Sequence, residues 1–187
     1  MKKRIIVGIT GASGIIYGIS LLNMLRDIPE IETHLVVSNA AKLAMQYEIN
    51  LKLNEIKALT DKCYNYNDIA APISSGSYKT LGMIIAPCSV KTFSEIATGV
   101  TSSLLTRAAD VILKEKRKLI LMVRETPLHS GHLETLLKLS QLGACIMPPI
   151  PAFYTNPKTI EDLVNYSVIR ALDLLDFDIP SSKRWKE

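Results

Sequence analysis

The sequence has few cysteines, and they are not spaced for a disulfide framework or a zinc site. Cys63, Cys88 and Cys145 are odd in number and far apart, with no CxxC pair among them. Disulfide-stabilised domains and thiolate zinc sites need paired or closely spaced cysteines. We therefore expect a protein whose stability comes from an apolar core, which 187 residues are enough to build.

Long apolar runs and strong charge are also missing. No stretch approaches the roughly 18 apolar residues of a membrane span, and residues 5–9 are too short an apolar run for a signal peptide. The net charge of +4 is small, and no nucleic-acid-binding motif accompanies the densest basic run, residues 114–118. We therefore expect a cytoplasmic protein with neither a membrane nor a nucleic-acid partner.

The apolar residues that are present predict an α/β fold. Continuous apolar runs lie at 5–9, 35–37, 83–86, 119–123 and 145–147, as expected of strands covered on both faces. Helical patterns lie between and after them, at 14–27, 39–48, 90–98, 102–116, 128–141 and 159–175. This alternation predicts a three-layer, flavodoxin-like or Rossmann-like parallel sheet with helices on both faces. Residues 1–178 are expected to form one domain and residues 179–187 a C-terminal tail.

The pattern is weakest over residues 50–80, whereas some helix starts are indicated by capping residues. Residues 50–80 predict only a short helix at 53–60 and an edge strand near 63–66. Ser38 or Asn39 can cap the helix that follows strand 35–37. Thr126–Pro127 is a suitable N-cap and N1 pair to begin the helix predicted at about 128–141.

The turn after the first strand, TGASG at residues 10–14, is typical of a phosphate-binding loop or of a tight structural turn. Its glycines do not follow GxGxxG, and Val37-Ser38-Asn39 lacks the acidic residue that binds a dinucleotide ribose. No Gly-Lys-Ser/Thr of a P-loop follows either. A mononucleotide phosphate, another small anion, or no ligand at all remain open.

Hydroxyls and one arginine follow the other strands as well. Ser38 follows the predicted strand 35–37, and Arg124 follows strand 119–123. The segment after strand 83–86 carries Ser89 and Thr92. Ligands of parallel α/β sheets lie at the carboxyl ends of the strands, and these groups suit a phosphate. On helix 102–116, Arg107, Asp110 and Lys114 share a face, which is either a solvated ion pair or a cationic pair for a phosphate leaving group.

Several segments together resemble the UbiX-like flavin prenyltransferases. They are ITGASG (9–14), SGSYKTLGMIIAPCSVKT (75–92), RAADVILKEKRKL (107–119), RETPL (124–128), PPIPAFYTNP (148–157) and a terminal Arg184-Trp185. The resemblance implies an FMN-binding α/β subunit that assembles into trimers and then a dodecamer, with active sites between subunits. Such enzymes transfer a dimethylallyl group from dimethylallyl monophosphate to N5 and C6 of reduced FMN without a metal. The prenylated FMN then serves a UbiD-type decarboxylase.

The resemblance also implies roles for individual residues. The FMN-binding set is Gly11, Ala12, Ser13, Ser38, Ser89, Val90, Lys91, Thr92 and Arg124. The dimethylallyl phosphate set is Tyr154 and Arg170, with Trp185 as a closing aromatic. The catalytic set is Arg107 and Lys114, which support the phosphate, and Glu125, which handles protons beside it.

Two alternatives remain. A flavin-dependent cysteine decarboxylase would carry a histidine after the middle segment and a P-x-x-A-N-T motif. This chain has no histidine between His34 and His129 and reads PCSVKT at 87–92. A non-catalytic FMN-binding protein would need no cationic set beyond the FMN pocket. His129 and His132 have no evident third ligand, so we expect no metal site.

Overall fold

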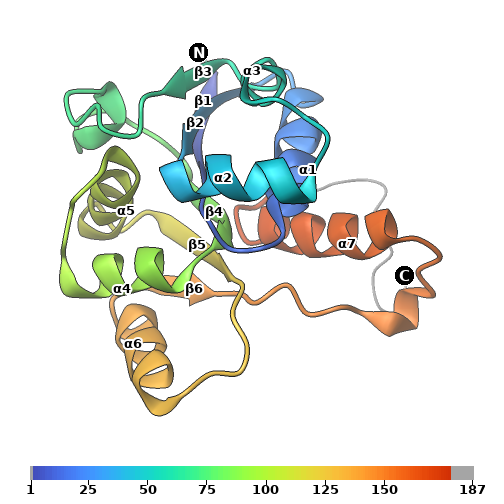
Figure 1. Ribbon diagram of the computed structural model, residues 1–187. Coiled ribbons are helices and arrows are strands. Elements are labelled where there is room, and N and C mark those ends of the chain that lie inside the picture. Colours follow the sequence, from blue (N-terminus) through green and yellow to red (C-terminus); the bar gives the residue numbers. More distant parts are fainter. Residues whose placement is uncertain (1, 178–187) are drawn as a thin grey trace.

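The computed structural model describes residues 2–177 and contains one sheet of six parallel strands (Figure 1). The predicted tail at 179–187 and its Trp185 lie outside the described residues. The sheet order is β3-β2-β1-β4-β5-β6. The strands are β1 (Lys3–Ile9), β2 (Ile31–Val37), β3 (Lys62–Tyr64), β4 (Gly82–Cys88), β5 (Lys118–Val123) and β6 (Ala144–Ile146).

Helices cover both faces of this sheet, which confirms the predicted three-layer α/β class. One face packs against α1 (Ile15–Arg26), α2 (Asn39–Glu48), α3 (Leu53–Lys57) and α7 (Ile160–Asp173). The other packs against α4 (Val90–Thr98), α5 (Leu104–Lys114), α6 (Ser130–Gln141) and the 3₁₀ turn η1 (Pro72–Ser74). A second 3₁₀ turn, η2 (Phe153–Thr155), precedes α7. Within residues 2–177, no helix combines the length and the apolar character needed to cross a membrane.

Two predictions about element ends are wrong. The second strand begins at Ile31 rather than at residue 35, because its polar Thr33 is buried and hydrogen-bonded to Asp61 instead of lying in a loop. Thr126–Pro127 does not begin a helix. These residues are joined by a cis peptide, and the cap of α6 is His129, whose side chain accepts from His132 N–H.

The sheet order places a crevice at the carboxyl ends of β1 and β4. The chain winds from β1 outward through β2 and β3, and then returns to the other side of β1 to build β4, β5 and β6. Adjacent loops diverge at such a reversal, and ligands of open α/β sheets bind there. Backbone hydrogen bonds tie its rim together, from Ser38 N–H to Ile9 O (2.9 Å) and from Thr10 N–H to Pro87 O (3.3 Å).

A buried histidine lies on the α5 side of the sheet, away from this crevice. The side chain of His34 is fully buried, and its Nδ1 lies 2.8 Å from the Tyr64 hydroxyl. Its ring stacks on Tyr64 and meets the edge of Tyr78, while Nε2 lies 3.1 Å from a Glu32 carboxylate oxygen. Burial lowers the pKa of His34 below its usual value, although the Glu32 charge opposes this.

We expect His34 to make stability depend on pH in the mildly acidic range. Its pKa is lower in the folded protein than in the unfolded chain, so the unfolded chain binds the proton first as the pH falls. The free energy of unfolding should therefore fall by up to about 1.4 kcal/mol per unit as the pH drops below about 6.5. Urea unfolding at a series of pH values measures this slope. His34→Gln should flatten it, and an equal slope in both proteins would contradict the assignment.

Candidate functional site

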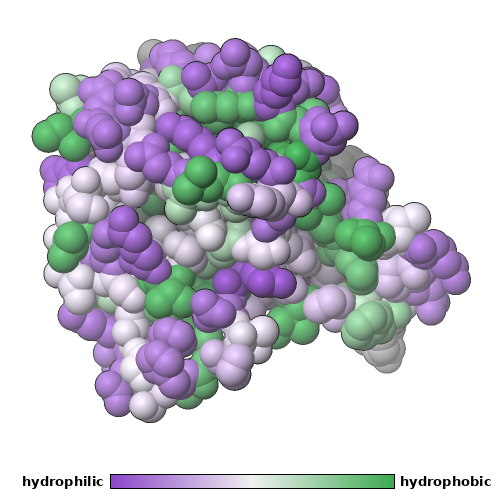
Figure 2. All heavy atoms as spheres, in the orientation of Figure 1, coloured by the Kyte–Doolittle hydropathy of each residue, from purple (hydrophilic) through white to green (hydrophobic). Residues whose placement is uncertain are grey.

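The crevice at the carboxyl edge of the sheet holds a cavity of about 480 Å³. The space-filling view shows a recess between α2 and α4, surrounded mainly by pale, weakly polar residues (Figure 2). Its lining comes from the ends of β1, β2, β4 and β5 and from the segment after β3. The lining residues are Gly11, Ala12, Ser13, Ser38, Asn39, Ala40, Tyr66, Ser89, Val90, Lys91, Thr92, Arg124 and Glu125.

This cavity brings together all nine residues of the predicted FMN-binding set, and Glu125 as well. Sequence reasoning missed Asn39, Ala40 and Tyr66. Asn39 and Ala40 follow the Ser38 cap in the first turn of α2. Because Ser38 was a predicted site residue, its position could have indicated these two residues as well. Tyr66 comes from the segment after β3, where neither hydrophobic periodicity nor a motif indicates a site.

The first turn of α2 forms one wall. Ser38 accepts a hydrogen bond from Ala41 N–H at 3.0 Å and so caps the helix. Gly11 lies so close that a Cβ added to it would be 2.4 Å from Ala40 Cβ. Glycine at this position therefore lets the loop after β1 approach the positive end of α2, where an anion is stabilised.

The first turn of α4 forms the facing wall. Ser89 N–H donates to the hydroxyl of Thr10 at 2.9 Å, and that hydroxyl donates to Pro87 O at 2.7 Å. The hydroxyls of Ser89 and Thr92 share a hydrogen bond of 3.1 Å, and Ser89 caps the helix. Two helix N-termini and several hydroxyls thus surround the same space, an arrangement that suits a phosphate.

The helix α1 is different, because the protein supplies its own anion there. The Glu48 carboxylate accepts from Gly14 N–H at 2.7 Å and from Ile15 N–H at 3.1 Å. Gly14 has a φ of +106°, which favours glycine. The N-terminus of α1 is therefore capped by α2, and the loop at Gly11–Ser13 is the part of this turn that lines the cavity. Glu48 is 33 and 34 residues away from these amides, so local patterns do not predict its role.

Besides Lys91, which pairs with Glu95 at 3.7 Å, a second cation lines the cavity, Arg124. Its backbone N–H donates to Cys88 O at 3.0 Å, which fixes it just beyond β5. Within residues 2–177 its guanidinium has no hydrogen-bond or ion-pair partner. It lies near Tyr17, whose pKa is raised by burial, an effect that the Arg124 charge opposes. The neighbouring Glu125 carboxylate accepts from Thr126 N–H at 2.9 Å. An uncommitted guanidinium beside two helix N-termini can bind a phosphate.

The predicted residues of α5 do not line this cavity. Arg107 donates through Nε to Ser74 O at 3.2 Å and through Nη1 to Asp110 at 2.7 Å. Lys114 pairs with Glu115 at 2.5 Å, and this pairing lowers the pKa of the Glu115 carboxyl. Both cations therefore lie against the loop that begins at η1, on the face of the sheet covered by α4, α5 and α6.

The predicted residues of η2 and α7 form another group. The hydroxyls of Tyr154 and Tyr166 share a hydrogen bond of 2.6 Å, and Arg170 pairs with Asp173 at 2.5 Å. Tyr154 raises the pKa of Tyr166 while the Arg170 charge opposes this rise, so the structure brings Tyr154 and Arg170 to a common neighbour. This group lies beside α7, on the face of the sheet opposite to the one that α5 covers (Figure 1).

The part of the chain that the structure describes contains no cluster of metal-binding side chains. No cluster of three or more His, Cys, Asp or Glu side chains there could hold an ion. His129 and His132 stack on each other with ring centroids 3.6 Å apart, and His132 also meets the edge of Phe93. Both histidines therefore have structural contacts at the start of α6.

Comparisons with known proteins identify the family of this chain. The family model for flavoproteins matches residues 1–172. The flavin prenyltransferase UbiX of Salmonella typhimurium is 54% identical over 186 residues, covering 98% of each chain.

Solved structures give the same result. AnUbiX (PadA1) in complex with FMN and dimethylallyl pyrophosphate is 46% identical, with a TM-score of 0.97 over 100% of this chain and 99% of that one. A dodecameric FMN-dependent UbiX-like decarboxylase from Escherichia coli O157:H7 is 47% identical, with a TM-score of 0.96 over 98% and 100%. The chain therefore belongs to the flavoprotein family and, within it, to the UbiX-like flavin prenyltransferases.

Proposed function

We propose that the protein transfers a dimethylallyl group from dimethylallyl monophosphate to N5 and C6 of reduced FMN. The observation that carries this proposal is the cavity at the carboxyl edge, which gathers the FMN-binding set and Glu125 in a chain 54% identical to a named flavin prenyltransferase. In this reaction the allylic C–O bond breaks, inorganic phosphate leaves, bonds form to N5 and C6, and one proton is lost.

The residues of the cavity fit FMN. Its phosphate would be held by the N-termini of α2 and α4, the hydroxyls of Ser38, Ser89 and Thr92, and the Arg124 guanidinium. No metal is needed for this, since dipoles and a guanidinium supply the positive charge. Reduced FMN, when bound, supplies the nucleophile, and the chain positions the partners and excludes water.

The leaving phosphate needs a second set of cations. Negative charge grows on its oxygens as the C–O bond breaks, and preorganised positive groups stabilise that charge strongly. We assign four groups to this phosphate: Arg107 and Lys114 from α5, and Tyr154 and Arg170 from η2 and α7. Glu125, at the rim of the FMN cavity, would accept the proton that is lost.

We further propose that these groups meet only between subunits. Arg107 and Lys114 lie on the face covered by α5, and Tyr154 and Arg170 on the face covered by α7. The sheet separates them within one chain, so a site that uses both requires more than one copy. A homo-oligomer built from trimers, such as a dodecamer, would supply those copies, and a solved relative is dodecameric.

We propose that the protein works in the cytoplasm and passes prenylated FMN to a UbiD-type decarboxylase. Its three cysteines are free thiols, which suits a reducing compartment. The cysteine decarboxylase alternative is not favoured, because the chain lacks a histidine between His34 and His129.

The direct test of the reaction is mass spectrometry of the flavin. The protein is incubated anaerobically with reduced FMN and dimethylallyl monophosphate, and the extracted flavin should gain one C5H8 unit. The diphosphate serves as a second donor, because a relative was crystallised with it. Flavin that binds but stays unmodified with both donors would favour a non-catalytic FMN-binding protein. Protein that takes up no flavin would contradict the whole proposal.

Ser38→Asp tests the FMN phosphate site separately from the chemistry. Aspartate is as good an N-cap as serine, so α2 should keep its start, while the new charge repels the phosphate. We expect the dissociation constant for FMN, measured by flavin fluorescence, to rise at least about tenfold.

Ser38→Asn is the matched control, because it keeps the cap without adding charge. It should bind FMN much more tightly than Ser38→Asp. Equal affinity of the two variants would remove Ser38 from the phosphate site.

A further inference from the structure

A second, smaller cavity of about 160 Å³ lies on the same carboxyl edge of the sheet, beside the edge strand β3. It is lined by Val37, Lys42, Leu53, Lys57, Cys63, Tyr64 and Asn65. None of these residues belongs to the FMN-binding, prenyl-phosphate or catalytic sets. At roughly 30 Å³ per water, the space admits about five waters or a small anion with part of its hydration.

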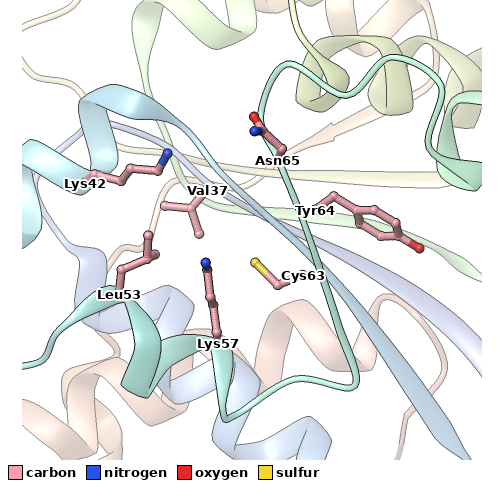
Figure 3. A pocket seen from close by; sticks show the side chains of 7 residues that line it. All are labelled: Val37, Lys42, Leu53, Lys57, Cys63, Tyr64 and Asn65. Carbon is pink, nitrogen blue, oxygen red and sulfur yellow. The ribbon is translucent and has the colours of Figure 1, made fainter.

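The charged side chains that line this cavity, Lys42 and Lys57, are both positive. Figure 3 shows Lys57 rising from α3 toward Cys63, and Lys42 reaching in from α2. Both lysines and Cys63 line the same cavity. Among residues 2–177 no carboxylate pairs with either ammonium. Lys42 donates to the Asn39 side chain at 3.1 Å.

The thiol adds no negative charge of its own. Burial raises the pKa of Cys63, and the two lysines only oppose that rise, so the sulfur is a neutral thiol near neutral pH. Val37, Leu53 and Cys63 pack against the main apolar core, which limits solvent on one side and strengthens electrostatic attraction. The Asn65 side chain lies over the same space, while the Tyr64 ring points away from it.

We propose that this cavity, bounded by Lys42, Lys57 and Asn65, is a further anion site that binds a small free oxyanion of the phosphate class. Two ammonium groups and an amide are suitable donors for such an anion, and its charge would offset the repulsion between the lysines. The volume favours the free anion over the phosphate of a nucleotide, whose base and sugar would remain outside. Lys42 and its partner Asn39 share the first turns of α2, and Asn39 also lines the larger cavity.

Protection of Cys63 from alkylation measures binding at this cavity. The FMN-saturated protein is treated with iodoacetamide at constant pH and ionic strength while inorganic phosphate replaces chloride. Peptide mass spectrometry then follows each cysteine. Phosphate should slow the modification of Cys63 saturably and leave partly buried Cys145, which lies on β6, unaffected. Equal slowing at both cysteines, or none at Cys63, would overturn the proposal.

Single lysine variants locate the anion. Lys57→Gln and Lys42→Gln should each raise the half-saturating phosphate concentration about tenfold, as expected for losing a charged hydrogen bond. Lys138→Gln on α6 is the matched control and should behave as the parent. Calorimetric titration with phosphate should rank the same variants without depending on the thiol. Parent-like binding in Lys57→Gln and Lys42→Gln by both methods would overturn the proposal.

Two further arms separate this site from other phosphate sites. Adenosine monophosphate should protect Cys63 less well than inorganic phosphate, and protection by the nucleotide alone would contradict a free-anion site. Omitting FMN should leave the phosphate protection of Cys63 in place. If protection appears only without FMN, the anion is binding through the larger cavity and the proposal fails. Neither arm depends on prenyl transfer.

Discussion

Parallel pairing of the strands is the constraint on which the rest of this structure depends. All six strands end at the same edge, so every loop that follows a strand is delivered to one rim. The reversal of winding between β1 and β4 then opens the crevice there. Short segments after five strands become neighbours in space although they are far apart in sequence. The cavity needs no long insertion, because the topology itself assembles it.

The same sheet also separates two groups of cations. It holds the N-termini of α2 and α4 at its edge, where their dipoles can attract a phosphate, yet it keeps the cations of α5 and those beside α7 on opposite faces. On the proposed function, a single chain therefore provides a mononucleotide pocket at the edge of its sheet, while the groups assigned to the leaving phosphate lie on opposite faces. Oligomerisation is, on this account, part of the active site rather than an addition to it.

Sequence patterns predicted what depends on local order and missed what depends on contacts at long range. Continuous apolar strands and a cap at Ser38 or Asn39 followed from periodicity and capping rules, and the structure has the cap at Ser38. The start of β2 did not, because buried Thr33 is satisfied by Asp61, a partner 28 residues away. The cap of α1 by Glu48 and the contribution of Tyr66 were hidden for the same reason. Capping at His129 instead of Thr126 shows that two good residue types in the right order do not by themselves fix a helix start.

The central claim is that α5 and the segment around α7 serve one site from different subunits, and mixed oligomers test it most directly. Lys114→Ala and Arg170→Ala chains should each bind FMN but fail to prenylate it. When the two are unfolded, mixed in equal amounts and reassembled, random assembly should place both intact residues at about a quarter of the sites. Turnover should return to about that fraction of the parent value. Mixtures that stay as inactive as the separate variants, while the reassembled parent is active, would contradict a site shared between subunits.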